Sequence, residues 1–401
     1  HLYDGTYMLE LWHGPTCAFK DMALQLLPYL LTTSAKKVAS DKEIVILVAT
    51  SGDTGKAALE GFKDVDKTKI IVFYPEDGVS KVQKRQMTTQ EGKNVCVAAI
   101  KGNFDDAQTG VKQIFGNPEI AQALANHNMM FSSANSINWG RLVPQIVYYI
   151  STYCELVKNE EINNGDVVNV VVPTGNFGNI LAAYYAKKMG LPLGKLICAS
   201  NSNNVLTDFL ATGTYDRNRP FHTTMSPSMD ILVSSNLERL LYLLSGDDKL
   251  IADLMKQLSE NGEYEVPADM LEKLHELFWA GFCDDEGAKT AIGKVWKERD
   301  YLIDPHTAVA FDALEQYRSE TGDQTPCIVV STASPFKFCD SVLSALGEEE
   351  KQNGLELLDE LSEKTGMPAP KPLSSLRDKE IRFTQTVEKD HMVDAVLGML
   401  E

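Results

Sequence analysis

Short runs of hydrophobic, often β-branched residues alternate along this chain with stretches of helical period. The runs are EIVILVAT (43–50), KIIVFYP (69–75), NVCVAAI (94–100), DVVNVVVP (166–173), KLICAS (195–200) and CIVVSTAS (327–334). They have strand length and few polar positions, which predicts strands buried on both faces. Helical patterns such as TGKAALEGF (54–62) and LAAYYAKKMG (181–190) separate them. This alternation predicts a mostly parallel α/β sheet.

The stretch from residue 201 to 325 is less regular. Within it, residues 247–278 predict helix with one charged face. The tail from about Gly347 is acidic and of helical pattern, with a proline-rich break at residues 367–372, and we expect it to form a surface extension. A chain of 401 residues is too long for one simple core, so two domains are expected.

The net charge restricts the classes of partner that the chain could bind, and the cysteine content indicates its compartment. The formal net charge of −18 argues against nucleic acid, which needs a basic footprint, although a local cluster of donors can still bind a small anion. The seven cysteines are scattered and show neither a C-x-x-C pair nor metal-ligand spacing. A reduced, cytoplasmic setting without a metal is therefore expected. The longest apolar runs are far shorter than a membrane span, so no membrane partner is expected.

Glycine-rich and hydroxyl-rich loops follow several of the predicted strands, where ligands gather in open parallel sheets. The first is ATSGDTGK (49–56), which differs from a P-loop because both the first glycine and the final hydroxyl are absent. Ser51, Thr54 and Lys56 supply more donors than a helix cap needs, so we predict an anion site. The alternative is a tight turn capped by Asp53 or Thr54.

Two further loops suit a phosphate group and an aromatic ring. PTGNFGN (173–179) has two glycines that let the backbone close around a ligand, and its N–H groups adjoin the positive end of a helix. We predict a phosphate site there, the alternative being an ordinary connection. In STASPFKF (331–338), the hydroxyl of Ser331 or Thr332 could bond a ring nitrogen, and spacing alone does not separate this from helix capping.

Arg141 ends the segment NSINWGR (135–141), where it suits bidentate contact with a phosphate or a carboxylate. The alternative is a solvated cap with a surface salt bridge. His306, in DPHT (304–307), precedes a helix start, and a structural histidine is the favoured interpretation.

Lys20 lies in HGPTCAFKDM (13–22), either as a surface lysine paired with Asp21 or as a lysine held for chemistry. The helix dipole disfavours a cation in a first turn, which points to a special role. A lysine near a sheet, a phosphate cradle, a hydroxyl for a ring nitrogen and a second anion site together suit pyridoxal phosphate holding an amino-acid substrate.

At this point the chain resembles a known family. HGPTCAFKD, ATSGDTGKAA, NSINWGR, PTGNFGN, SPSMDI (226–231), DPHTA (304–308) and STASPFKF are similar, in the same order, to the motif series of microbial and fungal threonine synthases. The resemblance covers about residues 8–340. Members of that family usually carry a substantial segment before the HGPT motif, so a fragment or a truncated chain is expected.

The resemblance implies a tryptophan-synthase-β-like α/β fold, with a large and a small α/β domain and the cofactor in the cleft. On this basis we expect residues 1–42 and 151–346 to form the large cofactor-binding domain. Residues 43–150 would form the small domain, and residues 347–401 a C-terminal helical extension.

The resemblance also assigns roles, with Lys20 as the Schiff-base lysine that acts as acid and base. The cofactor phosphate would be bound by Gly175, Asn176, Phe177, Gly178 and Asn179, and the ring nitrogen by Thr332. Asp53 and Ser51 lie in the loop that would contact the substrate carboxylate and the cofactor's phenolic oxygen. The substrate phosphate would be bound by Thr54, Lys56, Asn135, Ser136, Asn138 and Arg141.

The implied reaction converts O-phospho-L-homoserine and water to L-threonine and phosphate, by γ-elimination followed by β-hydration. One alternative is a threonine-synthase-like phospholyase, which gives a 2-oxo acid and phosphate. Another is an inactive protein that binds pyridoxal phosphate. The expected partner is a small phosphorylated amino acid, and the sequence leaves a monomer and a homodimer both open.

Overall fold

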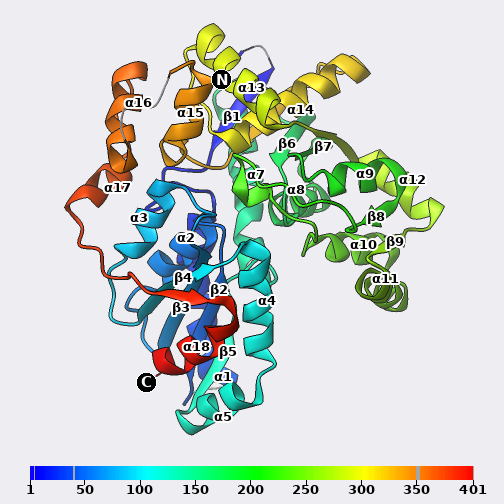
Figure 1. Ribbon diagram of the computed structural model, residues 1–401. Helices are drawn as coiled ribbons and strands as arrows, with labels where there is room; N and C mark the ends of the chain where they lie inside the picture. The colour runs from blue at the N-terminus through cyan, green and yellow to red at the C-terminus, as the bar shows by residue number, and fades with distance from the viewer. Residues whose placement is uncertain (4, 39–40, 349–352, 401) are drawn as a thin grey trace. The chain divides into compact units, whose positions relative to one another are not determined.

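The computed structural model describes residues 1–3, 5–38, 41–348 and 353–400, which fall into two compact units (Figure 1). Unit 1 comprises His1–Leu11 and Leu142–Glu349, and unit 2 comprises Trp12–Arg141 and Glu350–Glu401. These boundaries differ from the predicted division. Residues 12–42 and the tail group with the smaller predicted domain, whereas residues 142–150 group with the larger one.

Unit 1 is built on a five-stranded sheet in which every neighbouring pair is parallel. In spatial order the strands are β1 (Thr6–Glu10), β11 (Cys327–Ser331), β6 (Val168–Pro173), β7 (Leu193–Ser200) and β10 (Phe278–Phe282). Central residues such as Val170, Ile197 and Val329 are fully buried. Burial on both faces explains why these strands are continuous apolar runs, as predicted.

The helices of unit 1 connect and cover these strands. They are α7 (Ile146–Lys158), α8 (Gly178–Lys188), α9 (Val205–Thr212), α10 (Leu237–Ser245), α11 (Asp248–Asn261), α12 (Ala268–Leu277), α13 (Asp285–Arg299), α14 (Pro305–Thr321) and α15 (Cys339–Ala345). The prediction of helix throughout residues 247–278 is wrong in its middle. Gly262 has φ +81° and ends α11, and β9 (Glu263–Glu265) then pairs antiparallel with β8 (Thr214–Asp216).

Unit 2 contains a second, fully parallel five-stranded sheet. In spatial order its strands are β12 (Thr386–Glu388), β4 (Val95–Lys101), β3 (Thr68–Pro75), β2 (Glu43–Ala49) and β5 (Met129–Ser132). Its helices are α1 (Lys20–Val38), α2 (Asp53–Phe62), α3 (Lys81–Thr88), α4 (Phe104–Phe115), α5 (Pro118–Asn126), α16 (Leu357–Thr365), α17 (Lys371–Ser374) and α18 (Met392–Leu400), and the short α6 (Trp139–Leu142) lies at the boundary. Helix α1 packs directly on α2. The two backbones are so close that a side chain at Gly61 would clash with the carbonyl oxygen of Leu24.

The C-terminal tail completes unit 2, so the predicted surface extension is wrong for residues 386–400. Strand β12 pairs in parallel with β4, and Figure 1 shows the red end of the chain beside the cyan α4. Met392, Val396 and Leu400 are at most 2% exposed and join the core cluster of one face of the sheet. Their burial means that the tail contributes to the stability of the unit.

Within the described residues, no helix has both the length and the apolar character that a membrane span requires. All seven cysteines are free, and five of them are buried. No group of three or more potential metal ligands occurs among the residues that the structure describes.

Candidate functional site

Lys20 is the first residue of α1 and is only 7% exposed, so the interpretation as a solvated surface lysine is wrong. The preceding turn is rigid, because Cys17 has φ +58° and the Asp21 carboxylate accepts hydrogen bonds from the N–H (2.9 Å) and the hydroxyl of Thr16. The Lys20 ammonium lies 5.3 Å from the ring centroid of Phe19. The turn therefore presents a buried amine at the start of a helix.

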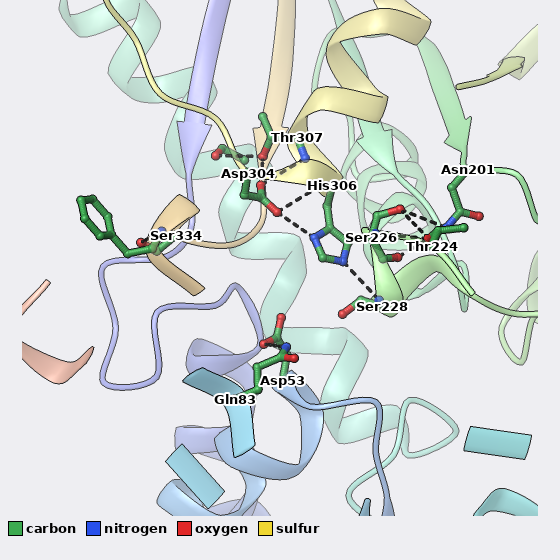
Figure 2. A network of polar contacts seen from close by, with 12 residues as sticks. Asp53, Gln83, Asn201, Thr224, Ser226, Ser228, Asp304, His306, Thr307 and Ser334 are labelled. Carbon is green, nitrogen blue, oxygen red and sulfur yellow. Dashed lines mark hydrogen bonds and ion pairs between the residues drawn. The ribbon is translucent and has the colours of Figure 1, made fainter. Parts of the chain in front are cut away.

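The SGDTG loop connects β2 to α2. Its N-cap residue is Gly52, and neither Asp53 nor Thr54 caps the helix as the alternative interpretation expected. Instead, the Thr50 hydroxyl accepts the N–H groups of Gly52 (2.9 Å) and Gly55 (2.8 Å). The buried Asp53 carboxylate accepts a 2.8 Å hydrogen bond from the amide of Gln83, shown in the lower part of Figure 2. Sequence reasoning missed Gln83 because it lies in a different element, helix α3.

Lys56 is buried but has an acidic partner in its own unit. Its Nζ atom lies 3.0 Å from the Glu60 carboxylate and is also hydrogen-bonded to Gln90. Burial alone would raise the pKa of Glu60, but the Lys56 ammonium, the Gln90 amide and the Lys63 ammonium together hold that pKa below its ordinary value. This pairing weighs against the predicted contact between Lys56 and a substrate phosphate.

Residues 135–141 follow β5, which neighbours β2 in the sheet of unit 2. The Asn135 amide donates to the carbonyl of Ala49 (3.1 Å), which brings this loop against the end of β2. Arg141 is 3% exposed and donates to the carbonyl of Ala134 (2.6 Å), so the alternative of a solvated surface arginine is wrong. Two segments thus follow adjacent strands, as expected in a parallel sheet. Their half-buried polar residues are Ser51 and the helical Thr54 after β2, and Asn135, Ser136 and Asn138 after β5.

The PTGNFGN loop of unit 1 follows β6 and is held tightly from behind. A Cβ atom at Gly175 would lie 2.7 Å from the carbonyl oxygen of Ser228, so only glycine fits there. Ser234 donates its hydroxyl to the carbonyl of Gly175 (2.9 Å), and Asn236 donates its amide to the carbonyl of Asn176 (2.8 Å). These contacts fix the loop without using its own N–H groups.

Phe177 and Asn179 complete the transition into α8. Phe177 has φ +61°, is buried, and contacts the ring of Phe278 with centroids 5.7 Å apart. The Tyr149 hydroxyl donates to Asn179, and burial raises the pKa of Tyr149 above its ordinary value, so the hydroxyl stays protonated. The Nδ2 atom of Asn179 is buried and has no hydrogen-bond partner in the structure. It lies in the first turn of α8, whose first N–H groups have no acceptors within the helix.

Thr332 directly follows β11, the neighbour of β6, and is 5% exposed. The preceding residue, Ser331, contacts the Thr307 hydroxyl at 3.1 Å. The predicted ring-nitrogen residue and the predicted phosphate loop therefore follow adjacent strands of one sheet.

His306 is buried and has partners on both ring nitrogens, which confirms the interpretation as a satisfied histidine. Its Nδ1 atom lies 2.7 Å from the Asp304 carboxylate, and its Nε2 atom lies 3.1 Å from the backbone nitrogen of Ser228 (Figure 2). Nearby, Asp230 accepts hydrogen bonds from Asn201 (2.7 Å) and Thr224 (2.7 Å). Burial raises the pKa of Asp230 above its ordinary value, and these hydrogen bonds oppose the rise.

Comparison with known proteins identifies the family of this chain. A family model described as "Pyridoxal-phosphate dependent enzyme" matches residues 7–333, and one described as "Threonine synthase, C-terminal" matches residues 307–396. The threonine synthase of Saccharomyces cerevisiae is 36% identical over 415 residues, covering 98% of this chain and 77% of its own length. The chain belongs to the threonine synthase family of pyridoxal-phosphate-dependent enzymes.

Solved structures agree with this family and with the predicted α/β fold class. The threonine synthase of Brucella melitensis, solved with pyridoxal phosphate bound, has a TM-score of 0.84 and 36% identity, covering 100% of this chain and 80% of its own. The yeast enzyme has a TM-score of 0.85 and 34% identity, covering 98% and 78%. Serine racemase of Dictyostelium discoideum, 15% identical with a TM-score of 0.51, shares the fold alone.

Other relatives are longer proteins. Threonine synthase-like 1 of Macaca fascicularis is 44% identical over 358 residues, covering 87% of this chain but 47% of its own length. The chain thus spans about half the length of these relatives.

The residues present fit the cofactor of the family. In unit 2, Lys20 supplies a buried amine, and in unit 1, Gly175 lets the turn at Ser228 pack against the back of the loop. The unpartnered amide of Asn179 and the N-terminus of α8 supply donors of the kind a phosphate group needs.

Proposed function

We propose that this chain binds pyridoxal phosphate through Lys20 and converts O-phospho-L-homoserine and water to L-threonine and phosphate. The observation that carries the proposal is the burial of the Lys20 amine at the start of α1, in a chain of the threonine synthase family. Burial of a lysine at a helix start costs free energy, and use of the amine to bind the cofactor would account for its position.

The loop residues of unit 1 would hold the cofactor. Residues 175–179 would bind its phosphate through backbone N–H groups, the Asn179 amide and the positive end of α8. The hydroxyl of Thr332 would bond its ring nitrogen. When bound, pyridoxal phosphate supplies an electron sink for the negative charge that forms at the substrate Cα.

Lys20 would move the protons of the reaction. Its Nζ atom would take one proton from the substrate Cα and one from Cβ, and would return protons at Cγ and, once water has added at Cβ, at Cα. An amine can accept a proton only when it is neutral, and burial favours the neutral form over the charged one. The burial of Lys20 supports this role.

The loops of unit 2 would bind the substrate. Ser51 and Asp53 would lie at the substrate carboxylate and the phenolic oxygen of the cofactor. The substrate phosphate would be bound by Thr54, Asn135, Ser136, Asn138 and Arg141. Lys56 has the weakest support in this set, because Glu60 already neutralises its charge.

The test is an assay of the purified chain with pyridoxal phosphate and O-phospho-L-homoserine. Released phosphate is measured together with the amino acid or oxo acid formed, and Lys20→Ala serves as the control. Equal amounts of phosphate and L-threonine are expected from the wild-type chain and neither from the variant. No phosphate release from a chain with bound cofactor would contradict the proposal and favour a binding protein.

A phospholyase is the second candidate function. Relatives named threonine synthase-like 1 are 42–44% identical to this chain, whereas three named threonine synthases are 36–41% identical. In the same assay, phosphate with a 2-oxo acid in place of threonine would select this candidate.

We further propose that the chain works in the cytoplasm as a monomer or homodimer and binds no nucleic acid. Seven free cysteines suit a reducing compartment, and the net charge of −18 disfavours polyanions.

A further inference from the structure

Asp304 is a fully buried carboxylate at the start of α14, and it accepts four hydrogen bonds. One oxygen accepts the N–H (3.1 Å) and the hydroxyl of Thr307. The other accepts the backbone N–H of His306 (3.1 Å) and contacts the Nδ1 atom of its ring (2.7 Å). A helix cap needs only the backbone contacts, so the contact with the ring needs a further explanation.

The partner on the other side of the ring defines the tautomer of His306. A backbone N–H group can only donate, and the nitrogen of Ser228 donates to Nε2 at 3.1 Å. Nε2 therefore carries no proton, and the proton of the neutral ring lies on Nδ1, where it is donated to Asp304. The Ser228 N–H and the Asp304 carboxylate thus favour the same tautomer, in which Nε2 accepts and Nδ1–H donates.

Ser228 connects this pair to the PTGNFGN loop. The carbonyl oxygen of Ser228 would lie 2.7 Å from a Cβ atom at Gly175, and the Cα atom of Met229 would lie 3.2 Å from it. The turn η2 (Pro227–Met229) therefore forms the rear wall of the loop that would bind the cofactor phosphate. The His306 ring fixes this turn by accepting a hydrogen bond from the backbone N–H of Ser228.

The same carboxylate also reaches the loop after β11. The Thr307 hydroxyl donates to Asp304 and also lies 3.1 Å from the hydroxyl of Ser331. Ser331 directly precedes Thr332, the residue predicted to bond the ring nitrogen. The His306 ring also contacts the Phe338 ring of this loop, with centroids 5.1 Å apart.

We propose that Asp304 and His306 are positioning residues that hold the Ser228 turn, and through it Gly175, in the conformation that binds the phosphate of the cofactor. The inference rests on the proposed function, because it deepens the account of the same site. Neither residue is assigned a contact with the substrate.

The experiment compares His306→Leu, which removes the acceptor for the Ser228 N–H, with His306→Gln, which keeps an acceptor. The readout is the dissociation constant for pyridoxal phosphate, measured by titration of the full chain and followed by absorbance. His306→Leu is expected to weaken binding about tenfold or more, as loss of the acceptor for the half-buried Ser228 N–H implies. His306→Gln is expected to stay within about threefold of the wild-type chain.

A second readout does not depend on the cofactor. Nitrogen-15 NMR of labelled histidine should show the Nδ1–H tautomer of His306 in the wild-type chain. This measurement applies even where His306→Leu fails to fold.

The outcomes separate this inference from the proposed function. A wild-type chain that binds no pyridoxal phosphate overturns the proposed function and the inference with it. Equal affinities of the Leu and Gln variants, or a proton on Nε2 in the wild-type chain, would overturn the inference alone.

Discussion

At the scale of single residues, burial distinguishes a few lysines of this chain from the others. Among the described lysines, Lys20, Lys56 and Lys337 are buried, at 7%, 5% and 0% exposure. Lys56 pairs with Glu60, and Lys20 begins α1 after the turn that the Thr16–Asp21 hydrogen bonds hold. The burial of three lysines means that burial alone does not identify the cofactor lysine, and its place in the HGPTCAFKD motif supplies the remaining argument.

Gly175 and Gly178 offer a matched pair of substitutions in one loop. Gly175→Ala would place a methyl group 2.7 Å from a backbone oxygen, whereas the nearest atom to a Cβ at Gly178 is a side-chain amide nitrogen at 3.5 Å. We expect Gly175→Ala to lower the free energy of unfolding by about 1–3 kcal/mol and to weaken cofactor binding, since the loop must shift. Gly178→Ala should change both much less. Thermal unfolding and cofactor titration measure these effects, and equal effects of the two variants would contradict the assigned fit.

Sequence patterns could predict the residues within motifs but not the residues that support them. Lys20, Gly175 and Thr332 lie in short segments whose composition signals a special loop. Gln83 and Asn236 donate hydrogen bonds to these loops from segments that are far away in the sequence. Such partners are set by the packing of the chain, and no local pattern marks them.

At the scale of elements, the predicted strands were the central ones. Strands β6, β3 and β2 are buried on both faces, which gives the continuous apolar runs that identified them. The unpredicted strands β1, β5, β10 and β12 are all edge strands of the two sheets. They have three to five residues and are only partly buried, so their periodicity is too short to recognise.

Asp323 stabilises the connection between α14 and β11. Burial raises the pKa of Asp323, but hydrogen bonds from Thr325, Tyr317 and Asn169 outweigh it and hold the pKa below its ordinary value. A depressed pKa contributes stability above the unfolded-state value of about 4, and this stability is lost as the pH falls through the folded-state value. We therefore expect Asp323→Asn to lower the free energy of unfolding near pH 7, by an amount that shrinks below about pH 4.

Urea unfolding of both chains across that pH range measures this effect. A difference between Asp323→Asn and the wild-type chain that stays constant into the acid range would show that the carboxylate charge is not what these hydrogen bonds stabilise.

At the scale of the whole molecule, the tail is part of the core of unit 2. Met392 is 2% exposed on α18, and Asp394 on the same helix is exposed. We expect Met392→Ala to lower the free energy of unfolding by about 2–5 kcal/mol, as for other buried methionines. Asp394→Ala should change it by less than about 0.5 kcal/mol. Denaturant unfolding measures both, and a neutral Met392→Ala would mean that α18 does not pack on unit 2.

The boundaries of the two units could not be derived from the order of elements. Residues 20–38 precede the first strand of unit 2, yet α1 joins that unit because Leu24 and Gly61 bring the backbones of α1 and α2 into contact. The tail returns to the same sheet through β12 after the whole of unit 1. The placement of α1 and of the tail in unit 2 depends on contacts between segments far apart in the sequence. The alternation of strands and helices, by contrast, was sufficient to predict the fold class.

The most direct test of the central claim is to locate the cofactor on the chain. The purified chain, loaded with pyridoxal phosphate, is reduced with borohydride, and the modified peptide is identified by mass spectrometry with Lys20→Ala alongside. The account predicts a visible absorption band that borohydride bleaches, a pyridoxyl group on Lys20, and neither in the variant. A pyridoxyl group on Lys56 or Lys337, or a chain that stays colourless with added cofactor, would contradict it.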